Sequence, residues 1–352
     1  MEQIGIILTK INDIVWGVPL IVLIMGTGLL LTARVKVLQF RHLGKALKFM
    51  VKNEESGTGE VSSFGALCTA LAATIGTGNI VGVAGAVTIG GPGALFWMVV
   101  AACLGMATKY AEGLLAIKYR VIEPDGHVLG GPFYYIENGM GKNWRWLGKM
   151  FAFFGTFAGL LGIGTMTQVN GIAGAVKTVF DPKGENIAFS IGEIDYSWAT
   201  VIAAVVVSLG VALVVIGGIQ RIASVTTVVV PFMAVAYVGV CLAILIYHAQ
   251  EIPAALLAIV RSAFGLDAVA GGAFGAVLLA MQKGVGRGIF SNESGLGSAP
   301  IAAAAAKTHE PVRQGLVTMT GTFIDTVVIC TMTGTTLMVT GAYRMFELEG
   351  VD

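Results

Sequence analysis

The 352-residue sequence has few charged residues, only four histidines and only four cysteines, and these shortages exclude several classes of protein. Charged residues make up 12% of the chain and the formal net charge is +1, so there is no basic stripe of the kind that binds nucleic acid. The histidines fall in separate connecting segments, and no two cysteines have the spacing of a metal or redox motif. The sequence therefore predicts neither a nucleic-acid partner nor a metal site built from these side chains.

Hydrophobic residues make up 55% of the chain and gather in stretches of about 20, the length that crosses a bilayer as a helix. This pattern predicts an all-α polytopic membrane protein with a lipid bilayer as its solvent. The first apolar run is too long for the core of a signal peptide, so we expect it to remain as a spanning helix. Eight candidate spans cover residues 14–33, 62–88, 94–117, 147–176, 197–217, 222–247, 268–306 and 314–341.

Lysine and arginine lie mainly on one side of these spans. Fourteen of them occur in the four stretches 34–60, 118–149, 218–222 and 307–313, and five occur in the alternate stretches and at the termini. Because basic residues accumulate in cytoplasmic connections, the asymmetry predicts that both termini lie outside the cell.

Two of the spans, 62–88 and 268–306, carry polar, glycine-rich interruptions. The first runs from Gly76 to Asn79 and the second from Gly286 to Gly297. Most glycines in a membrane bundle permit close helix packing, but Asn79, Asn292 and Glu293 are costly in hydrocarbon and occur where the helix is weakened. Because irregular backbone at membrane depth is tolerated only around a cavity, both spans are predicted to be broken helices that line a binding site.

The two interruptions are five spans apart, and repeats with an odd number of spans must run in opposite directions through the membrane, as in many secondary transporters. We therefore expect one transport domain over residues 1–352, with an extra helix at 14–33, a first repeat at 62–247 and a partial second repeat at 268–341. Only one further span follows 268–306, so the second repeat is expected to be incomplete.

Four motifs resemble those of the alanine or glycine:cation symporters, and the resemblance covers essentially the whole chain. They are Thr69–Ile80 (TALAATIGTGNI), Met106–Glu112 (MATKYAE), Gly130–Tyr135 (GGPFYY) and Gly288–Ile301 (GIFSNESGLGSAPI), the last followed by five alanines and Lys307.

The resemblance implies the leucine-transporter-like fold, with two inverted five-helix repeats whose first helices are unwound. It also implies a carrier in the plasma membrane that takes up alanine, glycine or another small neutral amino acid, driven by sodium or, less often, by protons, without an organic cofactor. Members of the family continue for about a hundred residues more, so this chain is expected to be C-terminally truncated.

A zwitterionic amino acid explains the residue types at the two breaks. Its carboxylate would bind the amides of a half-helix starting at Gly78–Asn79 and the Thr77 hydroxyl, and its ammonium would bind the last carbonyls of a half-helix ending near Gly288 to Phe290. The resemblance adds Gln168 and Phe290 to the pocket. The expected substrate-binding residues are Thr77, Gly78, Asn79, Gln168, Phe290, Ser291 and Asn292.

Sodium prefers oxygen ligands, and the family pattern places the backbone carbonyls of Ala72 and Ile75 at its site. The remaining ligands of the shared fold would come from a helix beyond Asp352. Lys109 and Glu112 lie three residues apart, which suits a local ion pair that snorkels to the surface near a helix end. Asp325, in the middle of an apolar span, is the stronger functional candidate among the intramembrane charges.

Two other classes of function are compatible with a membrane chain. An intramembrane hydrolase is disfavoured because the sequence has no G-x-S-x-G, no H-E-x-x-H and no histidine in any predicted span. A channel could also use broken helices, and it stays an alternative beside the proton-coupled amino-acid carrier.

Overall fold

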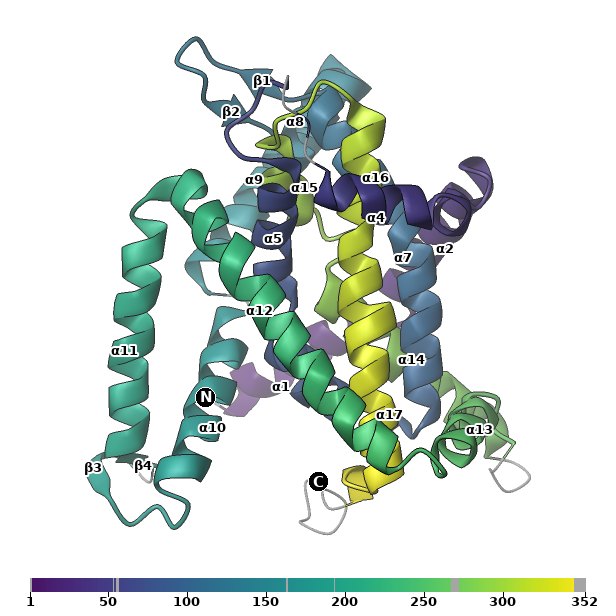
Figure 1. Cartoon of the computed structure of the whole chain (residues 1–352), viewed down its shortest axis with the longest axis vertical. Coiled ribbons are helices and arrows are strands. Elements are labelled where there is room, and N and C mark those ends of the chain that lie inside the picture. The colour runs from purple at the N-terminus through teal and green to yellow at the C-terminus, as the bar shows by residue number, and fades with distance from the viewer. Residues whose placement is uncertain are drawn as a thin grey trace.

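The computed structural model describes residues 2–52, 54, 57–162, 164–192, 194–266 and 272–344, which are mostly helical. The chain opens with two consecutive helices and then two short ones, shown in purple and dark blue in Figure 1. Their bounds are α1 Glu2–Val15, α2 Val18–Arg34, α3 Leu38–Arg41 and α4 Leu43–Val51.

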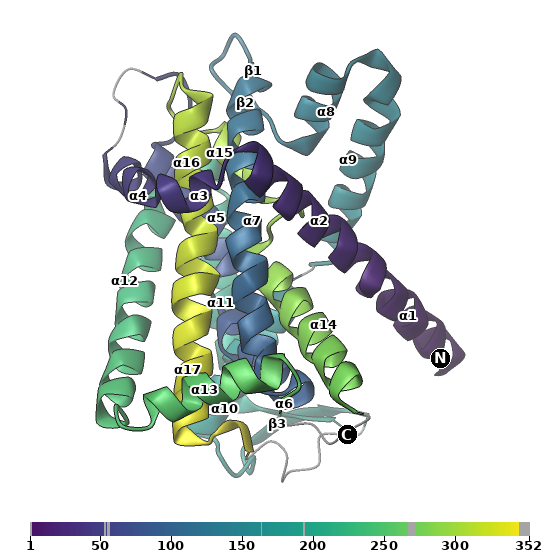
Figure 2. The ribbon, with the colours of Figure 1, turned by 90° about the vertical axis from the view of Figure 1, so that its right-hand side faces the viewer.

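The centre of the molecule is a bundle of long or interrupted helices. It consists of α5 Ser63–Thr74, the 3₁₀ turn η1 Thr77–Asn79, α6 Val81–Gly90, α7 Gly93–Lys118, α14 Ala273–Asn292, α15 Ala299–Ala304, α16 Pro311–Thr322, the π-helix η3 Phe323–Cys330 and α17 Thr331–Thr340. In Figures 1 and 2, α7 runs side by side with α16 and α17, and it also packs on α14. A Cβ atom at Gly284 of α14 would lie 2.1 Å from the carbonyl oxygen of Ala94, so this close helix contact requires glycine.

A second group of helices lies at the periphery of this bundle. The helices are α8 Pro132–Met140, η2 Lys142–Trp144, α9 Arg145–Leu160, α10 Thr165–Phe180, α11 Trp198–Val215, α12 Gly218–Tyr247 and α13 Ile252–Ala263. Two antiparallel hairpins accompany them, β1 Val121–Ile122 with β2 Val128–Leu129, and β3 Ile187–Ile191 with β4 Ile194–Ser197. Large apolar side chains such as Leu213, Ile216 and Phe232 are more than 60% exposed on α11 and α12 or at their ends, as expected of surfaces that face lipid.

Five helical runs among the described residues are long and apolar enough to cross a membrane, and a sixth is the bent pair of α5 with η1 and α6, which turns by 61°. The five are Gly93–Lys118, Trp198–Val215, Gly218–Tyr247, Pro311–Thr340 and Lys142–Phe180, the last of which consists of η2, α9 and α10 with an interruption between α9 and α10. The other two of the eight expected spans differ from the prediction. Residues 14–33 fall in α1 and α2, and α2 has only 17 residues. The run 268–306 is divided into α14 and α15, and its first residues, 268–271, lie outside the described part of the chain.

The four lysine- and arginine-rich connections lie at one end of the molecule, the upper end in Figure 1, where α4, α8, the α11–α12 turn and the α15–α16 link are found. Arg120 holds this end together, because its guanidinium donates hydrogen bonds to the carbonyls of Thr58, Ala304, Ala306 and Thr308 at 2.6–2.8 Å. Burial lowers the pKa of Arg120 from its usual value. These bonds tie the segment before α5 to the end of α15, so both interrupted helices are anchored at the same end.

Candidate functional site

The first helix break begins where the regular backbone hydrogen bonds of α5 end. The amide of Gly76, which would bond to the carbonyl of Ala72 in a continuous helix, donates instead to Oδ1 of Asn79 at 2.8 Å. The amide of Asn79 in turn bonds to the carbonyl of Gly76 rather than to that of Ile75. The carbonyls of Ala72 and Ile75, the expected sodium ligands, therefore lack their helical partners. Their role in binding sodium stays a prediction.

Gln168 of α10 closes the other side of this break. Its Oε1 accepts hydrogen bonds from the amide of Thr77 at 3.0 Å and from the Thr77 hydroxyl at 3.2 Å. The contact is close: a Cβ at Gly76 would lie 2.3 Å from Gln168 Oε1, and one at Gly171 would lie 2.6 Å from Cγ2 of Thr77. Small residues on both sides thus let a peripheral helix touch the unwound backbone directly.

The second break begins later than the sequence predicted. The expected half-helix ended near Gly288 to Phe290, but α14 continues to Asn292, and Glu293 then takes a left-handed conformation with φ of 54°. The amide of Ser294 bonds to Oδ1 of Asn292 at 3.0 Å, so the Phe290 carbonyl loses the partner that a continuing helix would give it. The helix α14 continues beyond Gly288 because the buried Asn292 side chain also bonds Thr326 and fixes the end of the helix at this residue.

A cavity of about 380 Å³ lies between the two breaks and α10, near the lower limit of the volumes usual for ligand pockets. Five of the seven expected substrate residues line it: Thr77, Gly78, Gln168, Phe290 and Ser291. A Cβ at Gly78 would meet no atom within 4 Å, so this position opens into free space.

The other two expected residues do not line the cavity. Asn79 and Asn292 are 1% and 3% exposed, and both side chains bond to η3 instead. Asn79 Nδ2 donates to Asp325 Oδ1 at 2.8 Å, and Asn292 Nδ2 donates to Thr326 Oγ1 at 3.0 Å. Both side chains lie behind the cavity wall in this structure, and their contact with substrate stays a prediction. Their amides bond buried oxygens because unsatisfied polar groups are expensive inside a bundle.

Asp325 is the centre of this buried polar group. Its side chain is fully buried, and its carboxylate accepts hydrogen bonds from Asn79, from Ser291 Oγ at 2.8 Å and from Thr326 Oγ1 at 2.7 Å. Asn79 belongs to the first break, Ser291 to the second, and Asp325 to the π-helix of the span between α16 and α17. One carboxylate therefore connects three separate elements beside the cavity.

The cavity also has a feature that the sequence did not indicate. Trp16, between α1 and α2, lines it and meets Phe290 edge to face with ring centroids 6.5 Å apart. The extra helix therefore contributes to the site and is not merely an addition to it. Arg287 and Glu293, with opposite charges, line the same cavity. No periodic pattern in the sequence indicates that Trp16 lines the cavity, because its contact with Phe290 depends on where the chain bends between α1 and α2.

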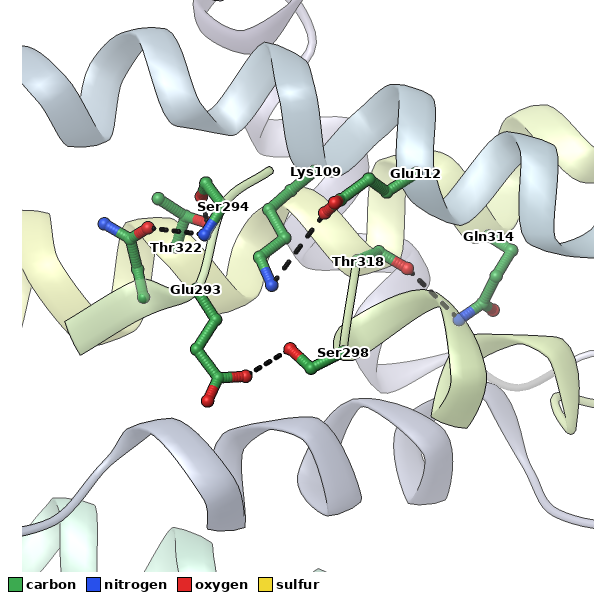
Figure 3. Close-up of polar contacts among 9 residues, drawn as sticks. Lys109, Glu112, Glu293, Ser294, Ser298, Gln314, Thr318 and Thr322 are labelled. Atoms are coloured by element: carbon green, nitrogen blue, oxygen red, sulfur yellow. Dashed lines mark hydrogen bonds and ion pairs between the residues drawn. The ribbon is translucent and has the colours of Figure 1, made fainter. Parts of the chain in front are cut away.

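Lys109 and Glu112 do not snorkel, contrary to the prediction. Their side chains are 4% and 8% exposed, and the ammonium and carboxylate lie 4.0 Å apart. Figure 3 shows both pointing from α7 toward the unwound segment that carries Glu293 and Ser298, whose side chains are hydrogen-bonded to each other. The pair is buried because this segment and α16 cover that face of α7, which the spacing of residues along α7 cannot reveal.

Comparison with known proteins identifies the relatives of the chain. All of residues 1–352 match the model of the sodium:alanine symporter family. An uncharacterised transporter of Haemophilus influenzae is 54% identical over 98% of this chain and 72% of its own length. The sodium/alanine symporter AgcS of Methanococcus maripaludis is 47% identical over 97% of this chain and 72% of its own length.

A third relative, from Bacillus subtilis, is described as a putative sodium/proton-dependent alanine carrier protein. It is 38% identical over 97% of this chain and 66% of its own length. The expectation that the chain is truncated is not supported by these findings and stays a prediction.

Proposed function

Because the chain belongs to the sodium:alanine symporter family, we propose that it carries alanine, glycine or a similar small neutral amino acid together with sodium by alternating access. The observation that carries this proposal is the cavity of about 380 Å³ that both helix breaks and Gln168 line. A site between two broken helices is the arrangement in which secondary transporters bind substrate near the middle of the membrane. The family consists of transporters, so we propose no enzymatic activity.

The cavity offers both kinds of group that a zwitterion needs. The amide of Gly78 has no hydrogen-bond partner among the described residues, and it lies on the cavity wall beside the Thr77 hydroxyl. We assign it to the substrate carboxylate, because an unpaired amide at the start of a half-helix favours an anion. The carbonyl of Phe290, which has no helical partner, is assigned to the ammonium group.

Alanine binding to the purified chain, measured in sodium and in choline at equal ionic strength, tests the proposal. Sodium coupling requires sodium to raise the affinity for alanine, because two ligands are coupled only through a difference in binding free energy. Equal affinity in both salts would contradict direct sodium coupling. No alanine binding in either salt would contradict the assignment of the substrate.

Proton coupling is the second candidate, and the relative described as a sodium/proton-dependent alanine carrier favours keeping it. Uptake of labelled alanine into proteoliposomes separates the two candidates. An inward sodium gradient at equal pH should drive accumulation. Accumulation driven by a pH gradient in the absence of sodium would instead establish the proton-coupled carrier.

The architecture and orientation are part of the same proposal. We propose a cell-membrane protein with one domain, in which the extra helix at 14–33 precedes a first repeat at 62–247 and a partial, inverted second repeat at 268–341. We propose that the N-terminus lies outside the cell, and the position of the four basic connections at one end of the molecule supports this orientation. The exposed residues Lys142 and Glu185 test this. A cysteine replacing Lys142 should react with an impermeant thiol reagent only from inside, and one replacing Glu185 only from outside. The reverse pattern would overturn the orientation.

A further inference from the structure

Trp16 lines the cavity from the segment between α1 and α2, outside both helix breaks and outside α10. Its ring meets that of Phe290 edge to face, with the ring centroids 6.5 Å apart and the ring planes at 64°. The backbone carbonyl of Phe290 is the group assigned to the substrate ammonium. Trp16 therefore packs against a residue that the proposed function places in direct contact with the substrate.

The bend between α1 and α2 fixes the position of the Trp16 ring. Gly17, which is buried, follows it as the N-cap of α2, and Pro19 stands in the first turn of that helix. Proline is favoured there because its fixed φ suits the start of a helix. Trp16 also packs on an apolar cluster that includes Val285 and Ile289 of α14. A tryptophan held by the bend and by this cluster forms a rigid wall, because its ring turns about only two side-chain bonds.

The apolar part of the cavity wall is the part left for the side chain of a substrate. The carboxylate and the ammonium are assigned to backbone groups at the two breaks, so the side chain must face other lining residues. The large apolar side chains of the lining are those of Trp16, Val81, Phe290 and Leu296. Trp16 is the largest of them. Because the cavity holds only about 380 Å³, a longer substrate side chain would have to displace one of these groups.

We propose that Trp16 limits the size of the amino-acid side chain that the cavity accepts. This inference rests on the proposed function and deepens it, since it names a residue that selects among neutral amino acids. The backbone groups at the breaks bind the carboxylate and the ammonium, which alanine and leucine share. A closely packed apolar wall can distinguish the two, because each added methylene that crowds it lowers affinity. The segment that joins α1 to α2 thereby takes part in substrate selection.

The decisive variant is Trp16→Ala, with Trp97→Ala as its matched control. Trp97 packs against the same apolar cluster but does not line the cavity, and its indole donates a hydrogen bond to the carbonyl of Ala263 at 3.1 Å. The measured quantity is the ratio of the dissociation constants for leucine and for alanine, on the purified chain in sodium. The wild-type chain and Trp97→Ala should bind alanine more tightly than leucine. Trp16→Ala should lower the ratio by roughly tenfold or more, because the space that the indole leaves accommodates the longer side chain.

The ratio separates substrate selection from a merely structural role of Trp16. If Trp16→Ala weakens the binding of both amino acids by the same factor, the ratio stays at its wild-type value and the proposal is overturned. A wild-type chain that binds leucine as tightly as alanine would overturn it as well.

A milder variant covers the case in which Trp16→Ala does not fold. Trp16→Phe keeps an aromatic ring against Phe290 and removes part of the volume of the indole. It should lower the same ratio by a smaller factor, and an unchanged ratio would contradict the proposal. If the wild-type chain binds neither amino acid, the proposed function itself fails. Alanine binding with an unchanged ratio in the variants refutes only the role of Trp16, so the two failures are distinguishable.

Discussion

The two helix breaks use glycine in different ways. At the first break, a Cβ on Gly78 would meet no atom within 4 Å, and the position faces the cavity. At the second break, Gly297 has φ of 81°, and a Cβ there would lie 2.7 Å from Pro132 and 2.8 Å from Phe151. The first glycine leaves space for a ligand, whereas the second is required by the protein's own packing.

The polar groups of the two breaks differ in the same way. At the first break, Gln168 holds Thr77 at the cavity wall, close to the point where a substrate would bind. At the second, Ser294 Oγ lies 3.1 Å from Thr322 Oγ1, and both residues are buried. We infer that the first break mainly recognises the substrate and that the segment beyond Asn292 mainly holds the structure. Substitutions at the two breaks should therefore have separable effects on binding and on stability.

The largest expected effect is that of Gly78→Leu on alanine binding. The leucine side chain would fill the cavity next to the Gly78 amide. The affinity for alanine should therefore fall by at least roughly a hundredfold, because loss of one charge-assisted contact can already cost that much and the side chain also excludes the substrate. Gly85→Leu is the control, because Gly85 lies on the helix that follows the same break, outside the cavity, and a Cβ there would also meet no atom within 4 Å. Alanine titration of both purified variants should show normal binding only in Gly85→Leu. Equal affinities in the two variants would place the substrate elsewhere.

The second effect is on stability and belongs to the other break. Gly297→Ala should lower the thermal unfolding midpoint because a left-handed residue costs about 1–3 kcal/mol and its Cβ would also clash with Phe151. Gly295→Ala serves for comparison, since Gly295 also has positive φ, 87°, but its nearest contact would be an ordinary 3.7 Å to Thr108. Gly297→Ala should therefore be the less stable of the two. If both unfold at the wild-type temperature, the assignment of a structural role to this segment is wrong.

The smallest expected effect comes from Gln168→Ala. It removes the acceptor that holds the amide and hydroxyl of Thr77, while water in the cavity can replace part of what is lost. Alanine affinity should fall about tenfold, because the loss corresponds to roughly one hydrogen bond that positions Thr77. Asn170→Ala, which also changes the cavity lining but not the contact to Thr77, should bind like the wild type. A larger loss in Asn170→Ala than in Gln168→Ala would contradict the role given to Gln168.

The sequence predicted the first break and placed the second within Gly286–Gly297, although α14 continues to Asn292, because glycines and polar residues in an apolar run have a direct physical cost. It also indicated Asp325, a carboxylate in the middle of an apolar span. It could not separate the residues at the cavity wall from those behind it. Thr77 and Asn79 are two residues apart in one turn, yet only Thr77 faces the cavity, because Asn79 bonds the carboxylate of a distant span.

Other features depend on contacts between distant segments and leave no local pattern. Lys109 and Glu112 are buried by the unwound segment beyond α14, and Trp16 reaches the cavity through the bend between α1 and α2. The expected span 147–176 is divided into α9 and α10, with positive φ at Gly162 and Gly164. Glycine is so common in this chain, with 49 residues, that these two could not be distinguished in advance from glycines that only permit close packing.

Protection of a cysteine at the first break by alanine tests the central claim most directly. A Gly78→Cys variant presents a small thiol in the open part of the cavity, and Gly85→Cys presents one on the following helix outside it. Our account predicts that alanine, in sodium, slows the reaction of a small thiol reagent at Gly78→Cys, with half-protection at the alanine dissociation constant of that variant. The reaction at Gly85→Cys should not change. If a Gly78→Cys protein that binds alanine reacts at the same rate with and without it, alanine does not occupy the cavity between the two breaks, and the account is contradicted.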